Sequence, residues 1–149
     1  MGGWWPGASL YMEYANIYSQ IWKDKKIKKL SPEGKVCFIY TFTNSSVTPS
    51  GIYNFDPEVA RVETGLKNSK FKKAFKEIID NGLIKWDEEE NLIWVVNKFK
   101  YTPKSPTIIR SIVRELIQSE HSFSKEFLKK YYDYFEGHLP PNYKRKSMV

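Results

Sequence analysis

One predicted helix, over residues 69–81, carries lysines and short polar side chains along one side. Ammonium groups neutralise phosphates, and Asn or Ser side chains can bond to the edges of nucleic-acid bases. At about 100° per residue, these polar residues lie away from the apolar stripe of the same helix. They are, together with the two residues before the helix, Lys67, Asn68, Ser69, Lys70, Lys72, Lys73 and Lys76. The pattern predicts a surface that binds a nucleic-acid backbone; the alternative interpretation is a solvated, lysine-rich face.

The same helix contains no arginine, the residue that most often reads guanine through two hydrogen bonds. Recognition of bases would therefore depend on Asn68, Ser69 and the lysines. We expect binding that tolerates differences in DNA sequence, or an origin-type site that sequence reasoning does not identify. In either case the affinity should fall steeply as the salt concentration rises.

Four consecutive acidic residues, Asp87–Glu90, follow this helix in the turn of a predicted hairpin. The two strands of the hairpin are predicted at Leu83–Asp87 and Leu92–Asn97, where Ile, Val and Trp are frequent. Carboxylates repel phosphate, so the turn is a poor contact for a nucleic-acid backbone. We interpret it as a charged, solvated turn, because a divalent-ion site needs converging ligands from elsewhere.

Patterns typical of catalysis or metal binding are not found in the sequence. His121, His138 and Cys37 have no metal-ligand spacing to one another. The chain has neither a phosphate-cradling glycine loop nor a nucleophile elbow, and no pair of acidic residues stands out for proton transfer. We therefore expect a protein that is not an enzyme and uses no cofactor or metal ion.

The composition of the chain favours an anionic partner. The 149 residues have a formal net charge of +7 and a pI near 9.3, which favours DNA first and an acidic membrane surface second. The apolar runs are far too short to span a membrane. The single cysteine, Cys37, excludes an internal disulfide and indicates a reducing compartment, so we expect a cytoplasmic protein.

Three further helices and a strand are predicted before the lysine-rich helix, and the first of these helices is a short one over residues 24–30. Ser31 caps a mostly buried helix over residues 32–43, and a short strand follows at 51–55. In the helix over residues 32–43, helical spacing relates Val36, Ile39, Tyr40 and Thr43, and Phe38 and Phe42 lie beside them. The next helix starts after Asp56 and stops at Gly65. Its inward side chains are predicted to be Val59 and Val62.

The lysine-rich helix itself is predicted to be capped by Asn68 or Ser69. The order helix, strand, helix, helix, β-hairpin predicts an α+β fold of the winged helix-turn-helix type, with the hairpin as the wing. Two additional C-terminal helices are predicted, one after Ser105-Pro106 and one that begins at Ser122 or Ser124.

The predicted elements divide the chain into four segments. They are a flexible N-terminal extension at 1–11, a winged-helix domain at 12–101, a C-terminal helical appendage at 102–137 and a basic flexible tail at 138–149. The helices of the appendage have broad apolar faces. These faces either fold back on the winged-helix domain or pair with another copy, which would make a homodimer.

Several short motifs occur in a fixed order between Tyr14 and Phe135. They are Ile21-Trp22-Lys23-Asp24, Lys26-Ile27, Leu30-Ser31-Pro32-Glu33, Gly51-Ile52-Tyr53, Glu63-Thr64-Gly65-Leu66, Gly82-Leu83-Ile84-Lys85, Ile93-Trp94-Val95-Val96-Asn97 and Phe99-Lys100-Tyr101. The series resembles the N-terminal winged-helix domain of phage replisome organisers and DnaD-like replication-initiation proteins. The resemblance implies DNA binding during primosome assembly, contact with other replication proteins and self-association, without catalysis.

The sequence departs from that family where its members often continue into a second helical domain, so contact with a helicase loader is left open. Two alternatives remain within the same predicted fold. One is a transcription regulator. The other is a winged-helix protein–protein interaction module, favoured by the acidic turn, the missing arginine and the apolar C-terminal helices.

Overall fold

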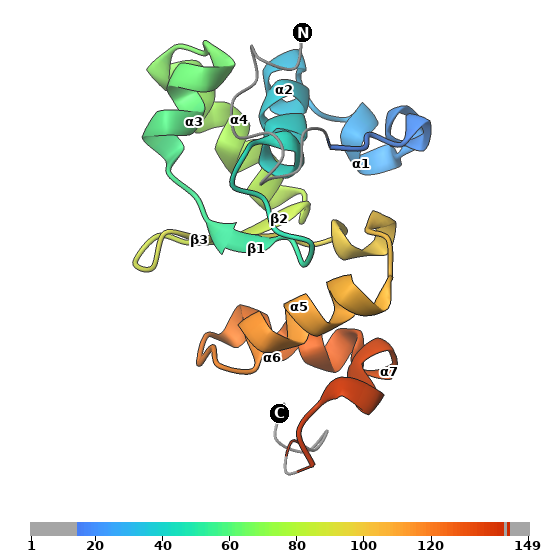
Figure 1. Cartoon of the computed structure of the whole chain (residues 1–149). Coiled ribbons are helices and arrows are strands. Elements are labelled where there is room, and N and C mark those ends of the chain that lie inside the picture. Colours follow the sequence, from blue (N-terminus) through green and yellow to red (C-terminus); the bar gives the residue numbers. More distant parts are fainter. Residues whose placement is uncertain (1–14, 142, 144–149) are drawn as a thin grey trace, which may run out of the picture.

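The computed structural model describes residues 15–141 and residue 143 (Figure 1). The α-helices in this part of the chain are α1 (Lys25–Lys28), α2 (Pro32–Thr43), α3 (Pro57–Thr64), α4 (Asn68–Asp80), α5 (Pro106–Leu116), α6 (Ser122–Lys130) and α7 (Tyr132–Phe135). The strands are β1 (Ile52–Asn54), β2 (Ile84–Asp87) and β3 (Leu92–Val95). Short 3-10 helices are η2 (Ser19–Lys23), η3 (Phe99–Tyr101) and η4 (Glu136–His138). The fold is α+β, and the predicted order of helix, strand, helix, helix and hairpin is present in it.

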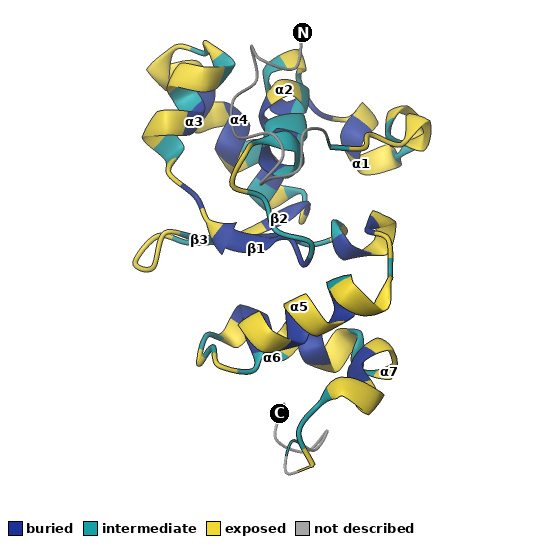
Figure 2. Cartoon of the chain, in the orientation of Figure 1, coloured by how far each residue is buried: buried dark blue, intermediate teal, exposed yellow. Residues whose placement is uncertain are grey.

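A small antiparallel sheet separates the helices into two layers. Its strand order is β1-β3-β2, so the second strand of the hairpin is central. Ile52 pairs with Trp94 on one side of β3, and Trp86 pairs with Ile93 on the other. Helices α2, α3 and α4 lie on one face of the sheet, and α5, α6 and α7 lie on the opposite face (Figure 1). Buried residues occur on the helices of both layers and on β1 between them (Figure 2).

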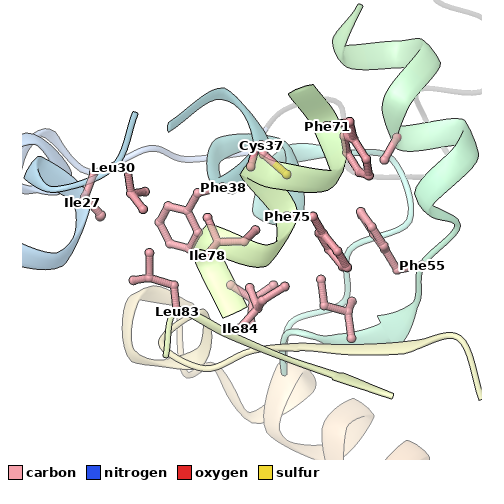
Figure 3. Packing of buried hydrophobic residues seen from close by; sticks show 14 of the residues in the cluster. Ile27, Leu30, Cys37, Phe38, Phe55, Phe71, Phe75, Ile78, Leu83 and Ile84 are labelled. Atoms are coloured by element: carbon pink, nitrogen blue, oxygen red, sulfur yellow. The ribbon is translucent and has the colours of Figure 1, made fainter. Parts of the chain in front are cut away.

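The first core cluster fills the space between α2, α4 and the sheet (Figure 3). Phe75 of α4 stacks on Phe55 with ring centroids 5.6 Å apart, and Phe71 stacks on Phe75 at 5.7 Å. Ile78 and Ile93 are completely buried beside them. Aromatic burial of this kind dominates the stability of small cores, and here it fixes which side of α4 faces inward.

The second core cluster lies on the other face of the sheet and shows where the C-terminal helices pack. Ile52 and Trp94 point to this face and contact the apolar sides of α5 and α6. Phe99 is fully buried at its centre, with the rings of Phe127 and Tyr131 at centroid distances of 5.2 and 4.8 Å. The apolar faces of α5 and α6 therefore fold back on the sheet of the same chain.

The residues at helical spacing in α2 are not the ones that the helix buries most deeply, although Phe38 beside them is buried. The residues that α2 buries are Gly34, Cys37, Phe38 and Thr41, whereas Val36 is 46% exposed. The buried residues also have helical spacing, but two of them are small, and α2 approaches α4 closely at Gly34. A Cβ at Gly34 would lie 2.0 Å from Glu77 Oε1 of α4. Because α2 is apolar on several sides, its periodicity does not single out the side that close packing selects.

The predicted inward residues of α3 were wrong. Val59 and Val62 are 48% and 63% exposed, and Ala60 is the residue that this helix buries. A hydrogen bond of 2.6 Å from the Tyr40 hydroxyl to Glu63 Oε1 further joins α2 to α3. The small side chain of Ala60 fits against the first core, and the larger valines remain on the solvent side.

The predicted last helix, which was expected to run to Phe135, is interrupted at Tyr131, so three α-helices rather than two follow η3 in the described residues. The predicted N-terminal extension, residues 1–11, lies outside the described residues. So does most of the predicted tail, including Lys144–Lys146. Of the described tail residues, Leu139 and Tyr143 are partly buried against the second core cluster.

None of the helices in residues 15–141 combines the length and the apolar character that crossing a bilayer requires.

Candidate nucleic-acid interface

A tight turn joins α3 to α4 and sets the direction of the lysine-rich helix. Asp56 caps α3 by accepting hydrogen bonds from the backbone N–H groups of Glu58 and Val59. Gly65 ends α3 in the left-handed conformation, with φ of 75°, and its N–H donates to the carbonyls of Arg61 and Val62. Glycine adopts this conformation without the steric cost that a side chain brings. The chain can therefore turn sharply into α4, which begins three residues later.

Replacing Gly65 with alanine should destabilise the protein through backbone strain alone. A Cβ at Gly65 would meet no atom within 4 Å, so neither crowding nor new packing contributes. We expect a loss of about 1 kcal/mol in the free energy of unfolding, measured by urea denaturation. Gly137→Ala is the matched control, because its Cβ also meets no neighbour and its φ is not positive. An equal loss in both variants would contradict the strain explanation.

Helix α4 has one buried and one exposed side, as its sequence predicts. The buried residues are Phe71, Ala74, Phe75 and Ile78. The exposed residues include all seven that the sequence analysis selected: Lys67, Asn68, Ser69, Lys70, Lys72, Lys73 and Lys76. The helix and the turn before it therefore bring these seven residues together on one surface, which we call the α4 basic face.

The lysines of the α4 basic face differ in how far their charge is compensated. Lys76 Nζ lies 2.6 Å from Asp80 Oδ2, and Lys70 Nζ lies 3.7 Å from Glu33 Oε1. Among the described residues, Lys67, Lys72 and Lys73 form no ion pair. The three unpaired lysines are thus the strongest candidates for contact with phosphate.

The first turn of α4 is open, contrary to the predicted cap by Asn68 or Ser69. The helix begins at Asn68, the N-cap position is Lys67, and no side chain of the described residues forms a cap hydrogen bond there. Asn68 and Ser69 lie inside the first turn, where their side chains cannot act as the N-cap. Backbone N–H groups at a helix start attract anions, and the first turn of α4 contains no acidic residue. The open start adds phosphate-binding groups to the α4 basic face.

Helix α4 is held on α2 by a carboxylate on its inner side. Glu77 Oε1 accepts hydrogen bonds from the backbone N–H of Ser31 at 2.7 Å and from the Ser31 hydroxyl at 3.1 Å. The same hydroxyl caps α2 by accepting from Gly34 N at 3.0 Å. These bonds fix the position of α4, so its exposed face is presented by a rigid element.

A second group of lysines, which the sequence analysis did not select, lies on η2 and α1. Its exposed members are Lys23, Lys25, Lys26, Lys28 and Lys29. Lys26 Nζ lies only 3.7 Å from the position that a Cβ on Gly82 would take, just after the end of α4. Trp22, 55% exposed, stands beside these lysines in the sequence. The sequence shows this group as five lysines within seven residues. It does not show that Lys26 lies close to the end of α4 in the folded protein.

The acidic turn of the hairpin is tied to the C-terminal layer. Asp87 Oδ1 accepts hydrogen bonds from the backbone N–H groups of Glu89 and Glu90, and Asp87 Oδ2 lies 2.6 Å from His121 Nε2. The hydrogen bond to His121, with those from the backbone, lowers the pKa of Asp87 below its usual value. His121 is therefore not in a free linker: it caps α6 and orients the hairpin against it.

The lowered pKa of Asp87 predicts a dependence of stability on acid. A carboxyl whose pKa is lower in the folded than in the unfolded protein stabilises the fold above its unfolded pKa, about 3.9, and loses that effect as the pH falls through its folded pKa. We expect the parent to be more stable than Asp87→Asn at about pH 5, and the difference to shrink on further acidification. Urea midpoints of both proteins measure this. A difference that is constant down to about pH 2 would contradict the role of Asp87.

Metal-binding clusters and accessible thiols are absent from the described residues. No group of three or more His, Cys, Asp or Glu side chains among them is arranged to hold a metal ion. Cys37 is fully buried, and this burial raises the pKa of its thiol to about 12, so it is not a reactive nucleophile in the folded protein. The chemistry that the α4 basic face can perform is electrostatic binding.

No protein-family model matches the chain, and no curated protein or solved structure matches it.

Proposed function

We propose that this protein is a winged-helix DNA-binding protein that places the α4 basic face against the phosphate backbone of duplex DNA. The observation that carries the proposal is that Lys67, Lys72 and Lys73, which form no ion pair with any described residue, meet on one exposed surface with a helix start that no described side chain caps. Lysines and helix N-termini are typical phosphate contacts, and Asn68 and Ser69 supply side chains for base edges.

The arrangement of the neighbouring elements supports the same proposal. In winged-helix proteins the second helix of a helix-turn-helix enters the major groove, and a hairpin follows it. Here α3, the Gly65 turn, α4 and the β2–β3 hairpin follow one another in that order. We assign α4 as the recognition helix and the hairpin as the wing. The acidic residues of the wing turn keep it away from phosphate, so α4 provides the main contact.

A role in replication initiation, by resemblance to phage replisome organisers, is the form of this function that we propose. The alternative of a protein–protein module drew on the apolar sides of α5 and α6. Those sides are buried against the sheet of the same chain, which removes one of the observations that favoured it. Homodimer formation and contact with other replication proteins remain proposals that rest on the family resemblance.

Fluorescence anisotropy of a labelled duplex, titrated with the full chain across a salt series, tests the function. The α4 basic face offers Lys67, Lys72 and Lys73 as free cations, so about three phosphates should be neutralised, and log K should fall against log [salt] with a slope of about −3. Labelled single-stranded DNA and a heparin competitor measure how far binding depends on duplex geometry. No binding to duplex at low salt would overturn the proposal.

A further inference from the structure

A cavity of about 430 Å³ lies on the side of the molecule formed by residues 15–24, α2, the loop after α2 and η3. Its walls are mainly apolar and include Ile21, Ile27, Phe38, Phe42, Leu83 and Val95. Cavities of about 300–1,000 Å³ with apolar walls and a few polar groups are typical of sites for small organic molecules. The cavity is separate from the seven residues of the α4 basic face, none of which lines it.

The one cationic side chain among the residues that line the cavity is Lys98, and it has no charge partner among the described residues. Lys98 is half-buried. Its one hydrogen bond runs from Nζ to Thr102 Oγ1, at 3.2 Å. An ammonium group has three N–H donors, so donors remain for a ligand. Burial, with the charge of nearby Lys104, lowers the pKa of Lys98, which is the effect expected of a cation without a counter-ion.

The other charged residue of the wall, Asp24, also forms no ion pair among the described residues, but one of its carboxylate oxygens is used within its own helix start. Asp24 Oδ1 accepts hydrogen bonds from the backbone N–H groups of Lys26 and Ile27, at 2.8 and 3.4 Å, and so caps α1. The Thr102 hydroxyl, 3.0 Å from the carbonyl oxygens of both Pro49 and Lys98, is held at the same end of the cavity as Lys98 Nζ. The cavity thus has an apolar body and one cationic, hydrogen-bonding end.

We infer that this cavity binds a small organic anion with an apolar body, a medium-chain or aryl carboxylate, whose carboxylate is held by Lys98 Nζ. The single cation suits one negative charge, whereas a phosphate ester with two charges would enter an apolar space with one charge uncompensated. A neutral ligand would leave the Lys98 ammonium without a partner. The inference does not depend on DNA binding, because neither the cavity nor the ligand involves α4.

Three probes of equal chain length test the inference on the full chain: octanoate, octan-1-ol and octylammonium. Binding is measured by isothermal titration calorimetry and by the shift in thermal unfolding. We expect octanoate to bind with one site per chain, about tenfold or more tighter than octan-1-ol, because a hydrogen bond to a charged group is worth at least that factor. Octylammonium should bind more weakly than either, since it brings a second cation to Lys98.

Two variants and one control locate the site. Lys98→Met keeps the aliphatic stem that packs beside Gly51 and should reduce octanoate binding to the level of octan-1-ol. Val47→Trp places a larger side chain in the cavity wall and should abolish binding of both probes, with circular dichroism to verify that the variant is folded. Lys100→Met, which removes a neighbouring exposed charge, should leave the preference for octanoate intact.

The inference is overturned if none of the probes binds the parent. It is also overturned if octanoate and octan-1-ol bind the parent equally, or if a folded Val47→Trp variant keeps the octanoate affinity of the parent. If Lys100→Met lowers octanoate binding as much as Lys98→Met, the probe is attracted by net charge alone, which also overturns it.

Discussion

Replacing Lys72 and Lys73 together with glutamate is expected to weaken duplex binding by about 100-fold at low salt. Both side chains are exposed on the α4 basic face, and neither has an ion-pair partner among the described residues. Charge reversal removes two phosphate contacts and sets two carboxylates against the backbone, and a loss of about 100-fold corresponds to about 2.7 kcal/mol. The slope of log K against log [salt] should become shallower by about two. Both quantities come from anisotropy titrations across a salt series.

A variant with the same net charge separates a local contact from a general loss of positive charge. Lys129 and Lys130 are exposed at the end of α6, in the layer opposite α4. Both double variants are compared at physiological salt, where Lys129→Glu with Lys130→Glu should weaken binding far less than the α4 variant, because charges beyond about 8 Å are screened there. Equal losses in the two double variants would mean that α4 is not the contact surface. Thermal unfolding of each variant shows whether the fold is retained.

Replacing Phe99 with alanine is expected to lower the free energy of unfolding by about 3–5 kcal/mol, the largest effect of any single substitution that we predict. Phe99 is fully buried and lies in ring contact with Phe127, Tyr131, Tyr134 and Phe135. Truncation leaves a cavity at the centre of the second core cluster, where α6, α7 and the segment after β3 meet. Urea denaturation followed by circular dichroism measures the loss.

Tyr134→Ala is the control for this prediction. Its ring touches Phe99 at a centroid distance of 5.5 Å, but Tyr134 is 50% exposed, so its loss should cost much less. If the two variants were destabilised equally, burial in the second core cluster would not be the cause. A large loss at Phe99 with a single unfolding transition would show that both layers unfold together, since Ile52 and Trp94 of the sheet are buried by the C-terminal helices.

Local signals made much of this fold predictable from the sequence. Ser31, Asp56 and Ser105 cap the helices that their positions predict, and proline follows each of them at the first helical position. The apolar stripe of α4 is regular, so the orientation of its lysines was predicted correctly. The hairpin strands were also expected within a few residues of their observed bounds. Each of these features is encoded by neighbouring residues.

Features that depend on contacts between distant residues were not predictable. The buried side of α2 is selected by the approach of Gly34 to Glu77, 43 positions later in the chain. Val59 and Val62 have the spacing of an inward stripe, yet the fit of Ala60 turns them outward. The cavity is lined by Lys98, by residues of α2 and by residues of the segment 15–24, which are far apart in the sequence. No local pattern carries such pairings, because they arise only when the layers pack.

Amide NMR spectra of the labelled full chain, recorded during a titration with duplex DNA, test the central proposal most directly. If α4 is the contact surface, the largest chemical-shift changes at low salt will fall on Lys67–Lys76, with smaller changes on the lysines of η2 and α1 and none on α5 or α6. The changes will reverse as salt is added. Shifts concentrated on the C-terminal helices, or no shifts at saturating DNA, would contradict binding through α4.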